Sequence, residues 1–376
     1  MQLTTLPEVL SPCLHPLPTD LQDKETRIRH RHVDFLVNPQ GAEVLRLRSK
    51  IIQHVRNFLI ADGHIEVQTP IFADGAGGAV ARPFRTQASE FPDRNINLRI
   101  APELWLKRMV IGGFDRIFEI GPSFRNEGID GTHNPEFTTC EFYRAYTDIE
   151  QLISLTEDLL LGLGKHLATT TNIASVDFEK PFDRIDFVPA LEAAIGRSLP
   201  DLTGCDANAE VKTILKTNLI AFDESTTLPQ MLDRLATAFL EPQCIKPTWI
   251  INHPECLSPL SKSFHHPQMN QKVSARAELF IKSRELINTY EEENSPFEQR
   301  RKFLQQMSYR QEGMNASLDE SYLEALEWGL PPTGGWGCGI DRLCMLMAGV
   351  DRIADVLSFG TLRNVVNLTQ KVGSQS

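Results

Sequence analysis

One segment of the chain places an arginine and a glutamate two residues apart, directly before a polar loop. Phe124, Arg125, Asn126 and Glu127 lead into residues 128–133. A guanidinium is a rigid fork of donors that matches phosphate and carboxylate oxygens, so Arg125 suits the binding of a polyanion. Arg and Glu at this spacing also occur as an ordinary surface pair, which contributes little. The segment therefore indicates an anion site when other residues support it.

Two further segments carry chemistry of the same kind. Glu278 and Glu285 lie on either side of a predicted strand turn, and hard carboxylate oxygens are what Mg²⁺ bridging ATP phosphates requires. A solvated acidic surface is the alternative for these two residues. Residues 335–342 read GWGCGIDR, which places glycines where a strand meets a helix and lets the backbone approach a ligand. A dinucleotide-binding fold would carry its glycines after the first strand, so their late position argues against that fold.

The elements that must position these residues follow from hydrophobic periodicity. Predicted helices cover residues 23–31, 41–61, 101–111, 149–167, 189–196, 207–216, 228–240, 295–313 and 342–348. Predicted strands cover residues 65–70, 98–100, 116–120, 136–146, 248–252 and 278–282. In the helix that begins near residue 41, Leu45, Ile52 and Leu59 repeat at seven-residue spacing and give a wide apolar stripe. The strands at 116–120 and 136–146 flank the polar loop at 125–135, where we expect the chemistry.

Charge and composition limit the classes of protein. Among 376 residues, 38 Lys and Arg against 49 Asp and Glu give a formal net charge of -11, which argues against a surface devoted to phosphate. Only a local basic patch, formed by Lys24, Arg27, Arg29 and Arg31, is expected to hold nucleic-acid phosphates. No apolar run is long enough to span a membrane.

The cysteines and the first residues bear on the compartment. The 7 cysteines are scattered without a C-x-x-C pair, so neither a disulfide framework nor a zinc site is predicted, and a reducing compartment is favoured. Residues 1–20 contain no Lys or Arg and no apolar core, so we predict neither a secretory signal nor a mitochondrial presequence.

Four sequence segments, in their order along the chain, resemble the class II aminoacyl-tRNA synthetases, and among them the lysyl-tRNA synthetases, particularly eukaryotic and fungal ones. The segments are RIAPEL at residues 99–104, RNEG at 125–128, HNPEFTTCEFY at 133–143 and PPTGGWGCGIDR at 331–342. The resemblance covers residues 20–365. Any one of these segments can match the family by chance, whereas a chance match of all four in this order is very improbable.

The resemblance implies an α+β fold: a class II aminoacyl-tRNA synthetase-type antiparallel sheet flanked by helices, with a helical insertion at about residues 150–245. Residues 1–40 would form an N-terminal lead-in and linker helix, and residues 41–372 the catalytic domain. The family also carries an N-terminal β-barrel that reads the anticodon. Few residues precede Arg27, so we expect that barrel to be absent from this chain, either in the protein or through truncation of the sequence. A homodimer through the helix at 44–59 is expected as well.

The resemblance also implies the reaction and the residues that perform it. The reaction is ATP-dependent activation of lysine to lysyl-adenylate, with Mg²⁺, followed by transfer to tRNA(Lys). The implied lysine-binding residues are Gly78, Glu103, Arg125, Glu141, Tyr143, Asn288 and Glu292. The implied ATP-binding residues are Arg125, Glu127, His133, Asn134, Phe137, Glu278, Glu285 and Arg342. Arg125 and Arg342 would be catalytic, and Glu278 and Glu285 would be the Mg²⁺ ligands.

The residues themselves are consistent with a lysine site. An ammonium removed from water needs carboxylates and hydroxyls around it, and Glu141 and Tyr143 alternate on one face of a predicted strand. Glu292 could join them, although the run Glu291–Glu293 is also typical of a solvated face.

Departures from the family pattern leave other functions open. Cys338 stands where a bulkier apolar residue is usual, and Ala277 replaces an aromatic residue. Neither change removes a polar ligand. The missing barrel favours one alternative, a standalone lysine-activating domain that acylates a protein or another acceptor. The other alternative is a non-catalytic, synthetase-like regulatory or binding protein, and the competent side chains at every matched ATP and lysine position argue against it. We expect the chain to act in the cytoplasm or the mitochondrial matrix.

Overall fold

An eight-stranded sheet organises the chain in the computed structural model, which describes residues 8, 10–75, 77–78, 81–170, 178–309 and 318–366. The strand order is β1-β5-β6-β13-β12-β11-β8-β7. The strands are β1 (Ile65–Glu66), β5 (Arg116–Phe124), β6 (Glu136–Ala145), β13 (Thr333–Gly339), β12 (Arg284–Glu291), β11 (Arg276–Ile281), β8 (Thr248–Ile251) and β7 (Asp183–Asp186). The inner pairs are antiparallel, and only the outermost pairs, β1–β5 and β7–β8, are parallel. The predicted α+β fold is confirmed.

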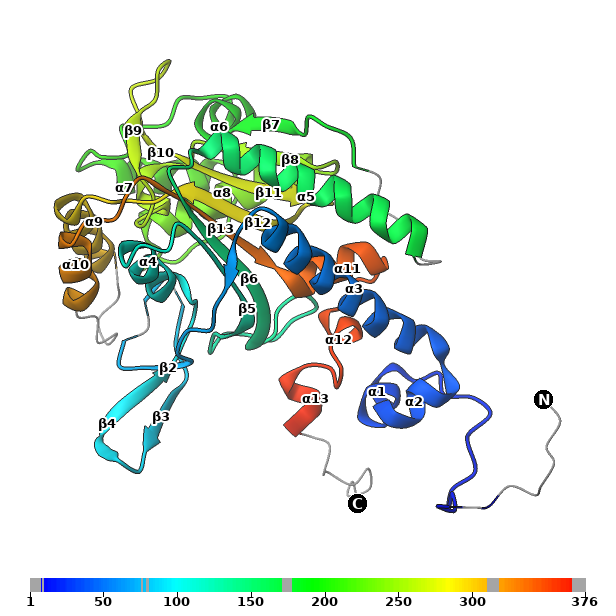
Figure 1. Cartoon of the computed structure of the whole chain (residues 1–376). Coiled ribbons are helices and arrows are strands. Elements are labelled where there is room, and N and C mark those ends of the chain that lie inside the picture. The colour runs from blue at the N-terminus through cyan, green and yellow to red at the C-terminus, as the bar shows by residue number, and fades with distance from the viewer. Residues whose placement is uncertain are drawn as a thin grey trace.

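Three helices cover one face of this sheet: α3 (Pro39–Ala61), α5 (Ile149–Thr170) and α11 (Ile340–Ala348) (Figure 1). Helix α3 buries Leu47, Ile51, Val55 and Leu59 against the sheet. Of the predicted seven-residue series only Leu59 is buried, and Leu45 and Ile52 are partly exposed, because the buried residues repeat every four positions and not every seven. On the strands the same face carries the apolar residues that alternate with the site residues. Trp336 of β13, for example, donates its indole N–H to Thr156 Oγ1 at 2.9 Å.

The opposite face of the sheet is covered at one end by α4 (Glu103–Ile111) and α10 (Glu320–Glu327), next to α9 (Pro296–Ser308). Leu104, Leu106 and Val110 of α4 pack with Tyr143 of β6 and with residues of α10 in a second core. The Ser295 side chain accepts a hydrogen bond from the Glu298 backbone N–H, which caps the start of α9. These helices border the site described below.

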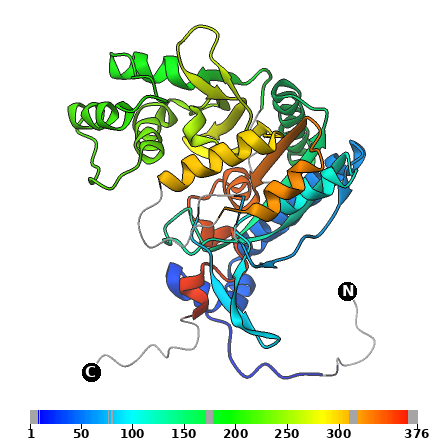
Figure 2. The same ribbon diagram turned by 90° about the vertical axis from the view of Figure 1, so that its left-hand side faces the viewer.

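A separate helical cluster has a core of its own and lies to one side of the sheet (Figure 2). It comprises α6 (Phe187–Ile195), α7 (Ala207–Thr217) and α8 (Leu228–Phe239), followed by short 3₁₀ turns at Glu241–Gln243 and Glu255–Leu257. We expected a helical insertion from about residue 150, but α5 packs into the main core, and the separate core begins at Phe187. The difference arises because α5 carries one apolar face long enough to cover the sheet.

Two small sheets lie outside the main one. The strands β2 (Phe72–Ala73), β3 (Arg85–Ala88) and β4 (Phe91–Leu98) form a projecting three-stranded sheet (Figure 1). The strands β9 (Ser263–His265) and β10 (Lys272–Ser274) form a hairpin. In the region of β2, β3 and β4 the sequence predicted one strand, at 98–100, because most of β4 is exposed and lacks alternating hydrophobicity. The predicted strand at 65–70 pairs over Ile65–Glu66 alone.

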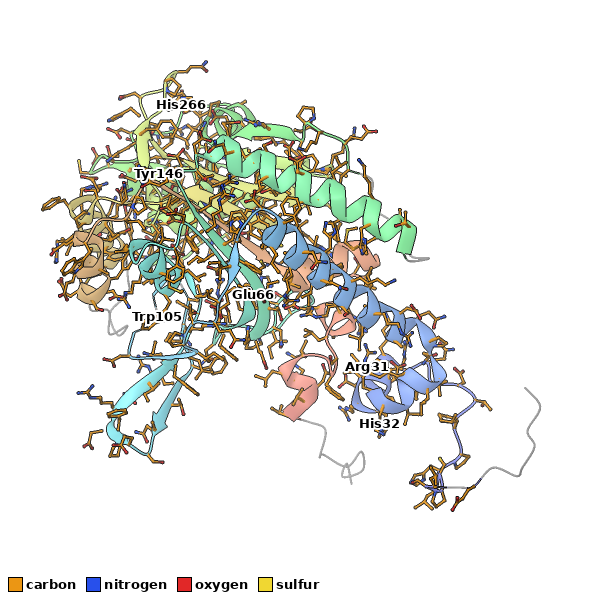
Figure 3. All side chains as sticks on the ribbon, in the orientation of Figure 1. Arg31, His32, Glu66, Trp105, Tyr146 and His266 are labelled. Atoms are coloured by element: carbon orange, nitrogen blue, oxygen red, sulfur yellow. The ribbon has the colours of Figure 1, made fainter. Side chains whose placement is uncertain are left out.

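Short terminal helices pack beside one another: α1 (Lys24–Arg29), α2 (Arg31–Val37), α12 (Ile353–Val356) and α13 (Leu362–Val366). Arg31, labelled in Figure 3, is buried, bonds to Asp34 at 2.7 Å and donates to the Asp355 carbonyl at 3.3 Å. Arg27 pairs with the same Asp34 at 2.6 Å, and Arg29 pairs with Glu25 at 3.2 Å. Two carboxylates of the same helices, Asp34 and Glu25, thus pair with three of the four cations of the predicted basic patch. No helix within the described ranges has the length and apolarity needed to cross a bilayer.

Candidate active site

The register of the sheet brings residues from distant parts of the chain into one row. Glu141 of β6 stands opposite Gly337 of β13, which stands opposite Asn288 of β12, which in turn stands opposite Glu278 of β11. Residues opposite one another in adjacent strands share a face. Glu141, Asn288 and Glu278 therefore lie on one face of the sheet, opposite the face covered by α3 and α5.

A second row runs beside the first. Tyr143 stands opposite Gly335, Gly335 opposite Tyr290, and Tyr290 opposite Arg276. Gly335 has a specific reason to be glycine, because a Cβ there would lie 1.8 Å from Glu292 Oε1 and 2.8 Å from Tyr143 Cε1. Between its neighbours, β13 thus forms a floor of bare backbone, which we call the glycine floor (Gly335, Gly337 and Gly339).

Helix α4 lies over this face of the sheet and contributes two buried charged residues, Glu103 and Lys107. Glu103, the first residue of α4, accepts hydrogen bonds at Oε1 from Lys107 Nζ at 2.5 Å and from the Tyr290 hydroxyl at 2.9 Å. Lys107 also forms an ion pair with Glu292. Gly78 has φ +91°, and a Cβ there would lie 3.1 Å from Glu103 Cβ, so the Gly78 backbone lies against Glu103.

The electrostatics of this cluster are dominated by an excess of carboxylates. Burial and the charge of Glu103 raise the pKa of Glu141 to about 8. Burial also raises the pKa of Glu292, although the charge of Lys107 acts in the opposite direction. Burial lowers the pKa of Lys107, but the charges of Glu103 and Glu292 outweigh it and leave that pKa above its ordinary value. Lys107 therefore stays an ammonium, and the cluster holds more carboxyls than cations, so a cationic ligand would favour ionisation of the carboxyls whose pKa is raised.

Arg125 lies at the turn out of β5. Its backbone N–H donates to the Pro135 carbonyl at 2.8 Å, which closes the polar loop, and its guanidinium carbon lies 5.1 Å from the centroid of the Phe137 ring. Burial raises the pKa of both Glu141 and Glu285, and the charge of Arg125 acts against both shifts. Arg125 thus lies within electrostatic reach of the carboxylate cluster and of the other end of the site.

That other end gathers the remaining predicted residues. Arg342 of α11 donates to His133 Nε2 at 2.8 Å and to the Glu285 carbonyl at 3.0 Å. Asn134 Oδ1 accepts from the Leu362 backbone N–H at 2.9 Å, so the loop is tied to α13. Glu127 lies exposed in the same loop, two residues after Arg125. The preceding residue of α11, Asp341, forms an ion pair with Arg48 of α3 and accepts from the Thr138 backbone N–H at 2.8 Å, which fixes the start of the helix.

Glu278 and Glu285 differ in how they are held. Burial raises the pKa of Glu278, but the charges of Arg276 and of His253, which lies 3.0 Å away, outweigh this and lower it to about 2. Burial and the charge of Glu278 raise the pKa of Glu285, so the two carboxyls repel each other. A divalent cation would relieve that repulsion, and the donors are the hard oxygens that Mg²⁺ prefers. The described residues contain no group of three or more metal-ligating side chains, so further ligands would have to come from phosphate or water.

Several residues of the site were not predicted from the sequence: Lys107, Tyr290, Tyr322, His253 and Arg276. One signal was available, because Lys107 follows Glu103 by four residues, the spacing of an ion pair on a helix. The run Glu291–Glu293 is only partly a solvated face, since Glu292 and Glu293 are buried beside Lys107 and Lys302. Ala277 and Cys338, which depart from the family pattern, lie buried in the main core.

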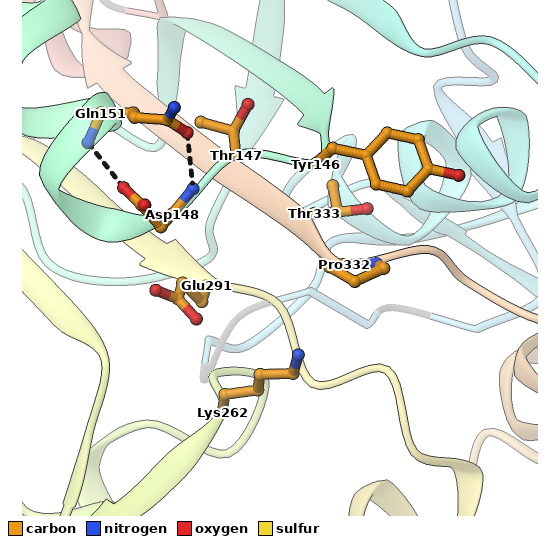
Figure 4. Close-up of a pocket in the computed structure, with 8 residues that line it drawn as sticks. All are labelled: Tyr146, Thr147, Asp148, Gln151, Lys262, Glu291, Pro332 and Thr333. Carbon is orange, nitrogen blue, oxygen red and sulfur yellow. Dashed lines mark hydrogen bonds between the residues drawn. The ribbon is translucent and has the colours of Figure 1, made fainter.

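A pocket of about 290 Å³ lies where β6 and β12 end (Figure 4). Its lining residues are Tyr146, Thr147, Asp148, Gln151, Lys262, Glu291, Pro332 and Thr333. None of them is a predicted site residue. Glu291, the neighbour of Glu292, points to this side and accepts from the Ile149 backbone N–H at 3.1 Å. Strand alternation thus sends two adjacent glutamates to different environments.

Comparisons with known proteins agree with this geometry. Residues 23–363 match the family described as tRNA synthetases class II (D, K and N). A lysine–tRNA ligase of Cladosporium cladosporioides is 41% identical over 95% of this chain and 62% of its own length. The mitochondrial lysine–tRNA ligase of Schizosaccharomyces pombe is 43% identical over 96% of the chain and 70% of its own length. A lysine–tRNA ligase of Aquifex aeolicus is 40% identical over 95% of the chain, which spans 60% of that relative.

Proposed function

The chain belongs to the class II tRNA synthetases and, within them, to the lysine–tRNA ligases, and on this basis we propose that it activates lysine with ATP and transfers it to tRNA(Lys). One observation carries the proposal: three carboxyls, Glu103, Glu141 and Glu292, converge over the glycine floor with a single ammonium, Lys107, among them. A buried site with more carboxyls than cations favours a ligand with two ammonium groups, since each ammonium would stabilise the ionised form of a carboxyl. Lysine has one at each end.

The substrate would lie along the rows of the sheet. Gly78 and Glu103 would receive the α-ammonium, since the Gly78 backbone lies against the Glu103 side chain. Glu141, Tyr143 and Glu292 would surround the ε-ammonium. Asn288, in the same row as Glu141, would help to hold the amino acid.

ATP would occupy the other end of the site. Phe137 and Arg342 would enclose the adenine, His133 would lie near the outer phosphates, and Glu127 and Asn134 would complete the contacts. Arg125 would bridge the lysine carboxylate and the α-phosphate, because its charge acts on carboxyls at both ends of the site. The family generally uses Mg²⁺, which Glu278 and Glu285 would hold and which would supply neutralising charge to the phosphates.

The chemistry requires no protein nucleophile. The lysine carboxylate would attack the α-phosphorus in line, which forms the bond to phosphorus, breaks the bond to the bridging oxygen, and yields lysyl-adenylate and pyrophosphate. A ribose hydroxyl of tRNA would then take the lysyl group and release AMP. Arg125 and Arg342 would accelerate the first step by positioning and by charge stabilisation.

Burial raises the pKa of the Cys140 thiol on β6, which is consistent with a structural role for that cysteine.

We also propose a homodimer and a place of action. The outer side of α3, with Leu45 and Ile52, lines an open pocket of about 520 Å³ together with Arg48, Ser49 and Arg56, among other residues. This partly apolar face would contact a second copy of the chain. The cytoplasm or the mitochondrial matrix would be the compartment, since relatives include a mitochondrial ligase and cytoplasmic ones.

The test is ATP–pyrophosphate exchange by the purified chain with Mg²⁺ and each amino acid in turn. We expect exchange with lysine and its loss in Arg125→Ala, with an unchanged thermal midpoint, because the substitution removes a phosphate contact and little core area. A stronger signal with aspartate or asparagine, or none with lysine, would refute the assignment. Exchange without charging of tRNA(Lys) would instead indicate another acceptor.

A further inference from the structure

Lys107 is a fully buried charge to which the activity proposed above assigns no contact with lysine or ATP. Lys107 has no exposed surface, and its ammonium lies between two carboxylates on different elements, Glu103 of α4 and Glu292 just beyond β12. Burying an ammonium is costly unless several groups compensate for it. The rings of Tyr290 and Tyr322 also flank it, with centroids 5.7 and 5.9 Å from Nζ. A position this demanding calls for an explanation beyond core packing.

The two carboxylates each use only one oxygen toward Lys107. Glu103 offers Oε1, which also accepts from Tyr290, whereas its Oε2 lies 3.7 Å from the Cβ position of Gly78. Glu292 offers Oε2, whereas its Oε1 faces the glycine floor at Gly335 and accepts no hydrogen bond from any described residue. The second oxygen of Glu103 thus lies beside Gly78, and that of Glu292 lies buried over Gly335.

On the basis of the proposed function, we infer that Lys107 is a positioning residue for lysine recognition: it binds one oxygen of Glu103 and one of Glu292, and so turns the other oxygen of each toward the two ammonium groups of the substrate. It also offsets one of three negative charges. The remaining surplus of two matches the two ammoniums of lysine, while the substrate carboxylate meets Arg125. Lys107 itself does not contact the substrate.

The charged and titratable groups around this ammonium come from four sides. They are Glu103 on α4, Glu141 and Tyr143 on β6, Tyr290 and Glu292 at the end of β12, and Tyr322 on α10. Apart from Lys107 they are all acids. Its removal therefore makes every neighbouring carboxyl harder to ionise.

The test is Lys107→Met, which keeps an unbranched apolar stem. We expect the KM for lysine to rise by roughly 10- to 100-fold with a nearly unchanged KM for ATP, because a buried charged partner is lost from the amino-acid end only. The acid limb of kcat/KM for lysine should also move to higher pH by about one unit or more. A role in folding alone would lower the thermal midpoint without moving that limb.

The matched control is Lys302→Met. Lys302 is also buried and pairs with Glu293 at 2.7 Å, one residue along from Glu292 but outside the site. We expect this variant to lose stability while keeping the lysine KM and the pH limb. A lysine KM that moves equally in both variants would overturn the inference.

A second variant keeps the question answerable if Lys107→Met does not fold. Tyr290→Phe removes the other donor to the same Glu103 oxygen and strands no charge, so the lysine KM should rise about threefold. An unchanged KM there, or in a folded Lys107→Met, would overturn the inference. If the wild-type chain shows no lysine-dependent exchange, the proposed function fails instead, so the two failures are distinguishable.

Discussion

Replacing Glu141 by glutamine should make the lysine-free chain more stable at alkaline pH. The pKa of this carboxyl is about 8 in the fold against an ordinary value of 4.5. Between these values the folded chain holds a proton that the unfolded chain releases. The stability that this carboxyl contributes is thus complete below pH 4.5 and is lost as the pH rises through 8.

The size of the effect follows from the same shift. At about 1.36 kcal/mol per unit, the difference sets an upper limit of about 5 kcal/mol. Glu141 is only half-buried, and solvent screening should reduce the gain to about 2 kcal/mol. A glutamine has no proton to lose, so the advantage of Glu141→Gln over the wild type should appear between pH 5 and 8.

The same substitution should remove lysine binding, since only the ionised carboxylate attracts an ammonium. In the wild type, about 1% of Glu141 is ionised at pH 6 and about half at pH 8, so lysine affinity should rise about 50-fold over that interval. The protonated form of Glu141 thus favours the stability of the lysine-free fold, whereas the ionised form favours substrate binding.

Thermal and urea unfolding without lysine at pH 5, 7 and 8.5, together with lysine binding by calorimetry over the same range, would check both expectations. Glu136→Gln is the control, because Glu136 lies on the same strand but is exposed. Unfolding midpoints of Glu141→Gln and wild type that stay a constant distance apart at every pH would refute the reasoning. So would a lysine affinity that does not change with pH.

Three further outcomes are expected. Gly335→Ala should lower the thermal midpoint, since its Cβ would lie 1.8 Å from Glu292 Oε1. Gly337→Ala should leave the thermal midpoint nearly unchanged, since its Cβ would meet no protein atom closer than 3.7 Å, and equal losses of stability in both variants would contradict this. Glu285→Gln should raise the Mg²⁺ concentration needed for half-maximal exchange by roughly tenfold, measured by titration at fixed ATP, and an unchanged requirement would count against its role as a ligand. In sedimentation at micromolar concentration the chain should behave as a dimer and Leu45→Asp as a monomer with an unchanged unfolding midpoint; a monomeric wild type that still activates lysine would exclude the dimer.

Much of the framework was predictable because it depends on local patterns. The apolar periodicity of residues 41–61 predicts the helix α3, although the seven-residue series does not give the face that covers the sheet, and the alternation along β6 places Glu141 and Tyr143 on the same side. The four sequence segments in their order then imply an antiparallel sheet flanked by helices, which periodicity alone cannot do.

The charged interior was not predictable in the same way. Lys107 lies in an ordinary amphipathic stretch, and its burial depends on Glu292, on an element far along the chain, as well as on the local partner Glu103. His253 and Arg276 likewise hold Glu278 through tertiary contacts. The β2–β3–β4 sheet was missed for the opposite reason, since its exposed strands need no apolar alternation.

The glycine floor bears on how a protein of this kind could change its substrate. Main-chain atoms have nearly the same shape and polarity whatever amino acid rests on them, so Gly335, Gly337 and Gly339 contribute room but no preference. Discrimination must come from the side chains that surround the floor, on β6, on α4 and at the end of β12. A descendant with another preference would keep the bare strand and exchange its surroundings, which suits a family that groups D, K and N enzymes together.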